Sequence, residues 1–124
     1  MLANGCFDVF HIGHMRYLEA ASKMGRVVVG VTLDAYVNKG PGKPIYGEKE
    51  RIEVVKSIRF VEDAFLVSSS YEALSLVYPD IFVKGIEYKG RILPEDLEFC
   101  RINEVEIMFT NTEEVRPRDR LRAR

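Results

Sequence analysis

The chain alternates short apolar strands with amphipathic helices, and this alternation limits the folds open to it more than any other feature. Strands are expected at residues 1–4, 27–32, 64–67, 81–84 and 105–109, and helices at residues 14–24, 48–60, 71–77 and 94–101. The run at residues 27–32 is mostly β-branched and uncharged, as in strands that are buried on both faces. Strands that alternate with helices form β-α-β units, which require parallel pairing. We therefore predict an α/β fold: a Rossmann-like parallel sheet of about five strands with helices on both faces.

Length and composition indicate a single globular domain that covers residues 1–124. The chain is 47% hydrophobic and 30% charged, and it is long enough to bury a core without support from disulfides or metals. The most apolar uncharged run, residues 27–33, is far too short to span a bilayer. The first residues have neither a basic region nor a long apolar stretch, so no secretory signal is expected. We therefore expect a cytoplasmic protein that does not associate with membranes.

Cysteine usage and charge exclude several classes of partner. Cys6 and Cys100 lack the paired spacing of zinc sites, so we expect two reduced thiols. A net charge of −1 gives no argument for nucleic acid as a partner. Five arginines and one aspartate give residues 116–124 a local charge of +4. This arginine-rich tail is either helical or a disordered end, and both interpretations stay open.

Residues 4–14, Asn-Gly-Cys-Phe-Asp-Val-Phe-His-Ile-Gly-His, form the most informative segment. Gly5 lets the backbone turn sharply out of the first strand, and a helix that begins near His11 presents unpaired N–H groups to an anion. His11 and His14 lie on one side of the first helical turn, and Gly13 between them leaves room for a ligand. Hydrogen bonds from the two imidazoles to a polyphosphate are the favoured role. A metal site and a purely structural role are the alternatives.

Residues 5–14 resemble the G-[TC]-F-D-x-x-H-x-G-H signature of the cytidylyltransferase-like nucleotidyltransferases. The H-x-G-H part alone also occurs in class I aminoacyl-tRNA synthetases, but this chain has no K-M-S-K-S element and no synthetase-sized body. Residues 39–45, the following Glu50-Arg51 and residues 83–89 also resemble the adenylyltransferase domain that makes ADP-heptose precursors. Glycerol-3-phosphate cytidylyltransferase is similar too, with loops that match less closely.

The resemblance implies transfer of a nucleoside monophosphate from a nucleoside triphosphate to a phosphorylated sugar or polyol, with release of pyrophosphate. ATP with an acceptor of the heptose 1-phosphate type is the first expectation, and CTP with glycerol 3-phosphate is the second. Mg²⁺ would accompany the triphosphate through its phosphates rather than through protein ligands. The implied catalytic residues are His11, His14 and Lys43; the nucleotide-binding residues are Gly5, Cys6, Phe7, His11, Gly13, His14, Lys84, Gly85 and Arg116; the acceptor-binding residues are Asp8, Lys39, Arg51 and Glu87.

Some of the cationic residues have a second interpretation. Lys39 and Lys43 lie on a loop rich in glycine and proline, where they either pair with phosphates or remain in solvent. Arg51 either binds the acceptor phosphate with two hydrogen bonds or forms a surface ion pair with Glu48 or Glu50.

The acidic residues and the C-terminal segment leave further alternatives. Asp8 either orients the acceptor or a Mg²⁺-bound water, or it caps backbone N–H groups. Glu87 stands where the family usually has aspartate. The family also has a Ser-Thr-Thr element that opens a last helix and holds the triphosphate, whereas residues 112–118 here read Thr-Glu-Glu-Val-Arg-Pro-Arg. Arg116 or Arg118 would replace the neutral donors with charged ones, or the grip on the triphosphate is impaired.

A rival hypothesis is a binding module that keeps the fold without catalysis and uses the arginine-rich tail on RNA or on a protein partner. The intact motif at residues 5–14 argues against it, so nucleic acid is not the expected partner. Symmetric dimers are usual in the family that the chain resembles, so a homodimer is expected on that ground alone.

Overall fold

The computed structural model describes residues 1–37 and 42–110, and their centre is a five-stranded sheet. Its strands are β1 (Leu2–Gly5), β2 (Val28–Thr32), β3 (Asp63–Val67), β4 (Ile81–Gly85) and β5 (Glu106–Thr110). They lie in the order β3-β2-β1-β4-β5, and each neighbouring pair is parallel. The predicted Rossmann-like parallel sheet is therefore confirmed.

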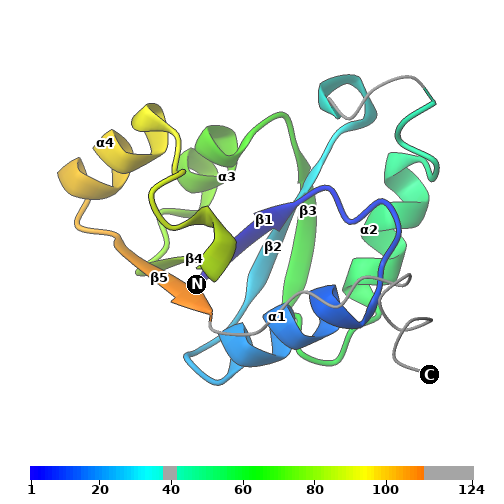
Figure 1. Ribbon diagram of the computed structural model, residues 1–124, viewed down its shortest axis with the longest axis horizontal. Coiled ribbons are helices and arrows are strands. Elements are labelled where there is room, and N and C mark those ends of the chain that lie inside the picture. The colour runs from blue at the N-terminus through cyan, green and yellow to red at the C-terminus, as the bar shows by residue number, and fades with distance from the viewer. Residues whose placement is uncertain (38–41, 111–124) are drawn as a thin grey trace.

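Helices cover both faces of this sheet. They are α1 (Ile12–Ser22), α2 (Glu48–Lys56), α3 (Ser70–Val77) and α4 (Pro94–Ile102), with the short 3₁₀ turns η1 (Asp34–Tyr36) and η2 (Ile86–Tyr88). Figure 1 shows α1 and α2 on one side of the sheet and α3 and α4 on the other. In the described residues no helix is long and apolar enough to cross a bilayer.

The core consists of two layers, because successive strand residues point to opposite faces of a sheet. Ala3 of β1 belongs to the layer under α1 and α2, and its neighbour Leu2 belongs to the layer under α3 and α4. The first layer includes Leu18, Val29, Val31, Val55 and Val83, and the second includes Val67, Leu74, Phe82 and Phe99. Burial of one such aliphatic side chain contributes about 1.5–3 kcal/mol, so packing holds the helices in place more than helix propensity does.

The helix boundaries differ most from the predicted ones at both ends of α1 and at the end of α2. Helix α1 begins at Ile12, which agrees with the helix start predicted near His11 and lies two residues before the predicted range 14–24, because the side chain of His11 caps it; it ends at Ser22. Helix α2 ends at Lys56 rather than at residue 60. The N–H of Ser57 donates to the carbonyls of Glu53 and Val54, and its hydroxyl donates to Val54 O at 2.6 Å. A serine hydroxyl that competes for helix carbonyls in this way favours termination.

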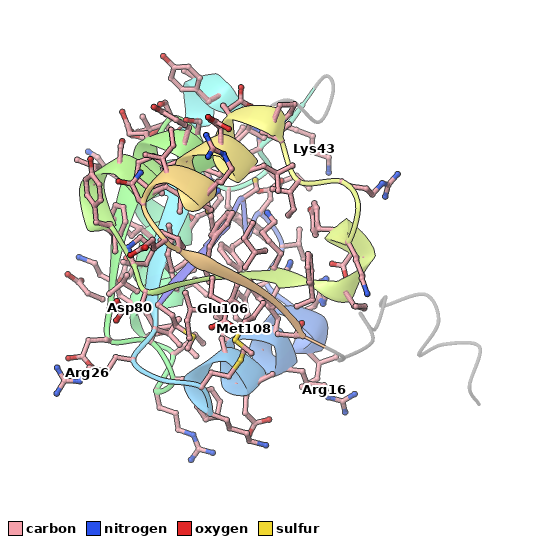
Figure 2. All side chains as sticks on the ribbon, turned by 90° about the vertical axis from the view of Figure 1, so that its left-hand side faces the viewer. Arg16, Arg26, Lys43, Asp80, Glu106 and Met108 are labelled. Carbon is pink, nitrogen blue, oxygen red and sulfur yellow. The ribbon has the colours of Figure 1, made fainter. Side chains whose placement is uncertain are left out.

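The strand order reverses between the parallel strands β1 and β4: β2 and β3 follow β1 on one side of it, and β4 and β5 lie on the other side. Ligands of such sheets bind outside the carboxyl ends of the strands at this reversal. Arg26 and Asp80 precede β2 and β4 and so mark the amino ends, whereas Lys43 lies at the opposite end of the molecule (Figure 2). A site is therefore expected at the carboxyl ends of the strands, the end of the molecule at which Lys43 lies.

Candidate active site

A pocket opens at the carboxyl ends of β1 and β4, where the sheet reverses. Its wall combines the turn after β1, the first turns of α1, the end of β4 with η2, and the last residue of β5. The lining residues are Asn4, Gly5, Cys6, Phe7, Gly13, His14, Tyr17, Lys84, Gly85, Glu87, Tyr88 and Thr110. The two segments that the sequence indicated, residues 5–14 and the residues after Val83, thus meet in one pocket.

The two histidines begin helix α1 as a reciprocal pair. His11 is the N-cap residue, and its Nδ1 accepts a hydrogen bond from the Gly13 N–H at 3.0 Å. The Nδ1 of His14 accepts from the His11 N–H at 3.2 Å, so the two side chains form a capping box. Their rings stack with centroids 4.0 Å apart. Because each Nδ1 is an acceptor, a neutral imidazole here carries its proton on Nε2.

Phe7 holds the histidine pair against the end of β1. Its backbone has a φ of 53°, and its ring contacts the ring of His14 edge-on at 5.3 Å between centroids. A Cβ on Gly5 would lie 3.0 Å from Cε2 of Phe7, so glycine at this position lets the ring lie close to the strand. Gly5 and Phe7 therefore act as a support for the imidazole of His14.

The opposite wall of the pocket carries one cation and one carboxylate. Lys84 Nζ lies 4.2 Å from the centre of the Tyr88 ring, a cation–π contact. Burial lowers the pKa of Lys84, and the nearby charges of Asp96 and Glu87 oppose that shift. The Glu87 carboxylate lies against the backbone of Gly85, where an added Cβ would be 2.4 Å from Oε1. The pocket thus offers a positive contact for phosphate and an acceptor for hydroxyl groups.

Asp8 caps backbone N–H groups, which was the alternative to a role in orienting the acceptor or a Mg²⁺-bound water. Its Oδ2 accepts from the Ile45 N–H and its Oδ1 from the Tyr46 N–H, both at 2.8 Å. The groups that it caps belong to the segment before α2 and not to α1, which His11 caps instead. Asp8 does not line the pocket, and both carboxylate oxygens are used within the protein.

The surface ion pair considered for Arg51 is wrong. Arg51 is only 1% exposed, and its carboxylate partner is Asp34, at 2.6 Å, rather than Glu48 or Glu50. Helix α2 turns this side chain inward, where its guanidinium donates to three backbone carbonyls as well. A sequence in which acidic residues flank the arginine along the chain suggests local pairing, but the residue lies on the buried face of the helix together with Val55.

The structure does not place the remaining predicted cations in the pocket lining. Lys43 is exposed and does not line the pocket. Lys39, Arg116 and the segment 112–118 lie outside the described residues, and so do the predictions that depend on them.

Sequence reasoning missed four residues of the pocket: Asn4, Tyr17, Tyr88 and Thr110. Tyr17 follows His14 by three positions on α1, a spacing that places both on one helical face. Its hydroxyl donates to Val83 O, and burial, followed by the nearby Tyr88 and Glu87, raises the pKa of Tyr17 far above the ordinary value. Asn4 and Tyr88 also line the pocket. Asn4 could have been found as the polar residue at the end of an apolar strand.

The described residues do not bring metal ligands together. Among residues 1–37 and 42–110, no group of three or more His, Cys, Asp or Glu side chains is arranged to hold a metal ion. Asp8, the acid considered for a Mg²⁺-bound water, instead has a backbone N–H on each oxygen. Within these two ranges Asp8 is therefore engaged by the backbone rather than grouped with other potential metal ligands.

Sequence comparison places relatives over most of the chain. The chain is 41% identical over 96 residues to the bifunctional protein HldE of Nitratiruptor sp., a match that covers 73% of this chain and 21% of that protein. It is 38% identical over 98 residues to the bifunctional protein HldE of Campylobacter jejuni subsp. doylei, covering 75% of this chain and 21% of the relative. The chain thus spans about a fifth of the length of these curated relatives.

Solved structures share the fold over nearly the whole chain. The lipopolysaccharide core biosynthesis protein from Thermoplasma volcanium matches with a TM-score of 0.74 and 28% identity, covering 90% of this chain and 95% of that one. A protein with unknown function from Archaeoglobus fulgidus matches with a TM-score of 0.64 at 18% identity, covering 92% of this chain and 93% of that one, which supports the fold alone. The family model described as cytidylyltransferase-like matches residues 2–115. With the motif at residues 5–14 and the pocket at the strand reversal, this match shows that the chain belongs to the cytidylyltransferase-like family, as the sequence predicted.

Proposed function

We propose that the protein is a nucleotidyltransferase that transfers a nucleoside monophosphate from a nucleoside triphosphate to a phosphorylated sugar, with release of pyrophosphate. One observation carries the proposal: a single pocket at the strand reversal joins the start of α1, with His14, to Lys84 and Glu87. Helix N-termini bind phosphate through their N–H groups and dipole, and the lysine adds a charge.

The chemistry follows from positioning and charge. A phosphate oxygen of the acceptor attacks the α-phosphorus in line; a new P–O bond forms as the bond to the bridging oxygen breaks, and the electron pair leaves with pyrophosphate. The acceptor phosphate is already ionised at neutral pH, so no general base is needed. His11 and His14 donate from Nε2 to the oxygens on which charge develops, and Lys43 contributes a cation to the same oxygens.

Mg²⁺ fits this proposal as a companion of the substrate, held by the phosphates. When bound there, it would neutralise part of their charge. The chain's own residues bind and orient the triphosphate through the start of α1, through Lys84 and through the backbone of Gly85.

The proposed pair of substrates is ATP and a heptose 1-phosphate-type sugar. Residues 39–45 and 83–89 support it through their resemblance to the adenylyltransferase domain that makes ADP-heptose precursors. The HldE relatives and the lipopolysaccharide core biosynthesis protein are in keeping with it. The Glu87 carboxylate suits an acceptor rich in hydroxyl groups, because it can accept several hydrogen bonds. A homodimer, which is expected from the family resemblance, and a cytoplasmic location belong to the same proposal.

The first experiment identifies the substrates. Thermal shift with each of the four nucleoside triphosphates selects the base, and pyrophosphate release against a panel of sugar and polyol phosphates then selects the acceptor. Preference for CTP and glycerol 3-phosphate would replace the proposed substrates and leave the reaction class unchanged. Binding of RNA without pyrophosphate release from any pair would contradict the enzyme proposal.

The second experiment tests His14 with two variants. His14→Ala removes the imidazole, and pyrophosphate release should fall about 10²–10³-fold, the scale of one lost transition-state donor. His14→Gln keeps a side-chain oxygen that can accept the His11 N–H, as glutamine does in capping boxes. This variant should melt close to the wild type while release stays at least about tenfold lower. Near-normal release by either variant would refute the role of the imidazole.

A further inference from the structure

The segment that carries Lys43 is tied to the histidine turn through Asp8. Asp8 precedes His11 by three residues, and its carboxylate accepts the N–H groups of Ile45 and Tyr46 at 2.8 Å each. Ile45 follows Lys43 by two residues. Because two extended residues span at most about 7 Å, the backbone of Lys43 lies no farther than this from an N–H group that Asp8 holds.

Arg51 ties the same segment to two more parts of the sheet end. Its Nε donates to Tyr46 O at 2.9 Å, and its Nη1 donates to Cys6 O at 2.9 Å and Thr32 O at 2.6 Å. Its Nη2 donates to Asp34 Oδ1 at 2.6 Å. One buried guanidinium therefore joins the turn after β1, the end of β2 and the segment before α2.

The charges make this network persistent at neutral pH. Burial raises the pKa of Asp8. The opposing effect is larger and comes from the N–H groups of Tyr46 and Ile45 and the charges of Lys43 and Arg51, so the pKa lies below the ordinary value. Asp8 is therefore ionised and keeps both acceptor oxygens. Hydrogen bonds to a charged group contribute more to stability than hydrogen bonds between neutral groups do.

A direct ligand role would conflict with these contacts. A phosphate that took Arg51 as a partner would compete with three carbonyls and Asp34 for a side chain that is only 1% exposed. A sugar or a metal that bound Asp8 would share oxygens that already accept the Ile45 and Tyr46 N–H groups, and it would weaken those hydrogen bonds. Both residues therefore act through the segment that they hold.

Resting on the role proposed for Lys43, we infer that Asp8 and Arg51 are positioning residues. Their shared hydrogen-bond network fixes residues 43–47 against the histidine turn, so that Lys43 and His11 can contact the same triphosphate at the same time. Neither side chain touches the substrate. Polyphosphate binding and turnover depend on them through Lys43, because a displacement of about 1 Å in a catalytic group can cost about 10²-fold in rate.

The test is a double-mutant cycle with Asp8→Asn and Lys43→Ala in the full chain. The amide group of asparagine offers one acceptor where the carboxylate offers two, so one backbone N–H loses its partner. Asp8→Asn should speed hydrogen exchange at the Ile45 and Tyr46 amides and lower the rate of pyrophosphate release up to about 10²-fold. Because Asp8 acts through Lys43, Asp8→Asn should lower the rate less than about twofold in the Lys43→Ala background.

Matched variants separate positioning from stability. Asp63→Asn makes the same chemical change in an exposed carboxylate at the amino end of β3, at the opposite end of the sheet, and should leave exchange and turnover unchanged. Asp34→Asn removes the negative charge of the exposed partner of Arg51, and it should reproduce the Asp8→Asn effect more weakly and only when Lys43 is present. It replaces Asp8→Asn if that variant does not fold.

Each outcome decides the inference. Independent, multiplying losses from Asp8→Asn and Lys43→Ala would overturn it, and so would unchanged exchange at both amides. If the wild type releases no pyrophosphate with any substrate pair, the proposed function fails, and the same cycle is then measured on the affinity for Mg²⁺–ATP. Coupled losses of that affinity support the positioning role without catalysis, and independent losses or no loss overturn it.

Discussion

Gly85→Ala isolates the position of one carboxylate in the pocket. Gly85 has φ −66° and ψ 154°, extended values that alanine adopts without strain. An added Cβ would lie 2.4 Å from Oε1 and 2.6 Å from Oε2 of Glu87. These atoms are the end of a flexible side chain, so the fold stays intact while the carboxylate moves.

The size of the effect follows from this geometry. Ordinary contact begins at 3.4 Å, so Oε1 at 2.4 Å must retreat by 1.0 Å or leave its rotamer. If Glu87 binds acceptor hydroxyls, a displacement of about 1 Å should lower kcat/KM for the acceptor about 10²-fold. Loss of one charge-assisted hydrogen bond, about 1.5–3 kcal/mol, gives a similar range. Stability should change by less than about 1 kcal/mol, because alanine also restricts the unfolded chain.

The assay is steady-state pyrophosphate release with the acceptor varied at saturating triphosphate, alongside triphosphate affinity by calorimetry. Affinity for the triphosphate should change less than about threefold, because alanine keeps the backbone groups through which residue 85 is proposed to bind it. Glu87→Ala should add little to Gly85→Ala. Gly47→Ala serves as the control, since a Cβ there meets only Asp34 Oδ2 at 3.8 Å. A Gly85→Ala enzyme with wild-type kcat/KM for the acceptor would refute the role of Glu87, and an equal loss of triphosphate affinity would assign the effect to the nucleotide instead.

Two further predictions concern stability. Gly30→Ala should lower the free energy of unfolding by about 1–3 kcal/mol, because the added Cβ would meet Asn4 Oδ1 at 2.4 Å and Ala73 Cβ at 3.1 Å inside the sheet layer; an unchanged urea midpoint would contradict this packing. The pKa of Asp8 is lowered in the folded state from 3.8, so its contribution to stability is complete above about pH 4 and is lost as the pH falls through the folded pKa. Asp8→Asn should therefore flatten the acid limb of a plot of urea midpoint against pH, and superimposable limbs would show that the carboxylate is not held.

Most of the fold could be predicted from the sequence because strand and helix patterns are local and their parallel pairing is nearly obligatory. The strand at residues 27–32 is recognisable from its β-branched run alone, and the structure assigns Val28–Thr32 to it. Helix ends were less predictable. Histidine is not a usual N-cap residue, so the apolar pattern alone places the start of the first helix two residues too late, whereas the motif at residues 5–14 places it near His11.

The pocket was predictable where one short segment determines it, and not where distant parts of the chain meet. Residues 5–14 carry the turn and the helix start within one stretch, so their arrangement follows from local geometry. The environment of Arg51 depends instead on Cys6, Thr32 and Asp34, which come from two other segments. Neither spacing nor charge along the chain reveals that these two carbonyls and this carboxylate converge on the buried face of α2.

The use of histidine in the capping box links folding to the proposed chemistry. A cap needs only an acceptor, and serine with glutamate would supply two of them. Here the acceptors are the Nδ1 atoms of His11 and His14, so the hydrogen bonds that start the helix also leave each neutral ring protonated at Nε2. A carboxylate cap would bring negative charge toward a polyphosphate, whereas an imidazole brings an N–H donor. The helix start is thus built from side chains whose other nitrogen suits phosphate, and the stacking of the rings at 4.0 Å keeps the two donors together.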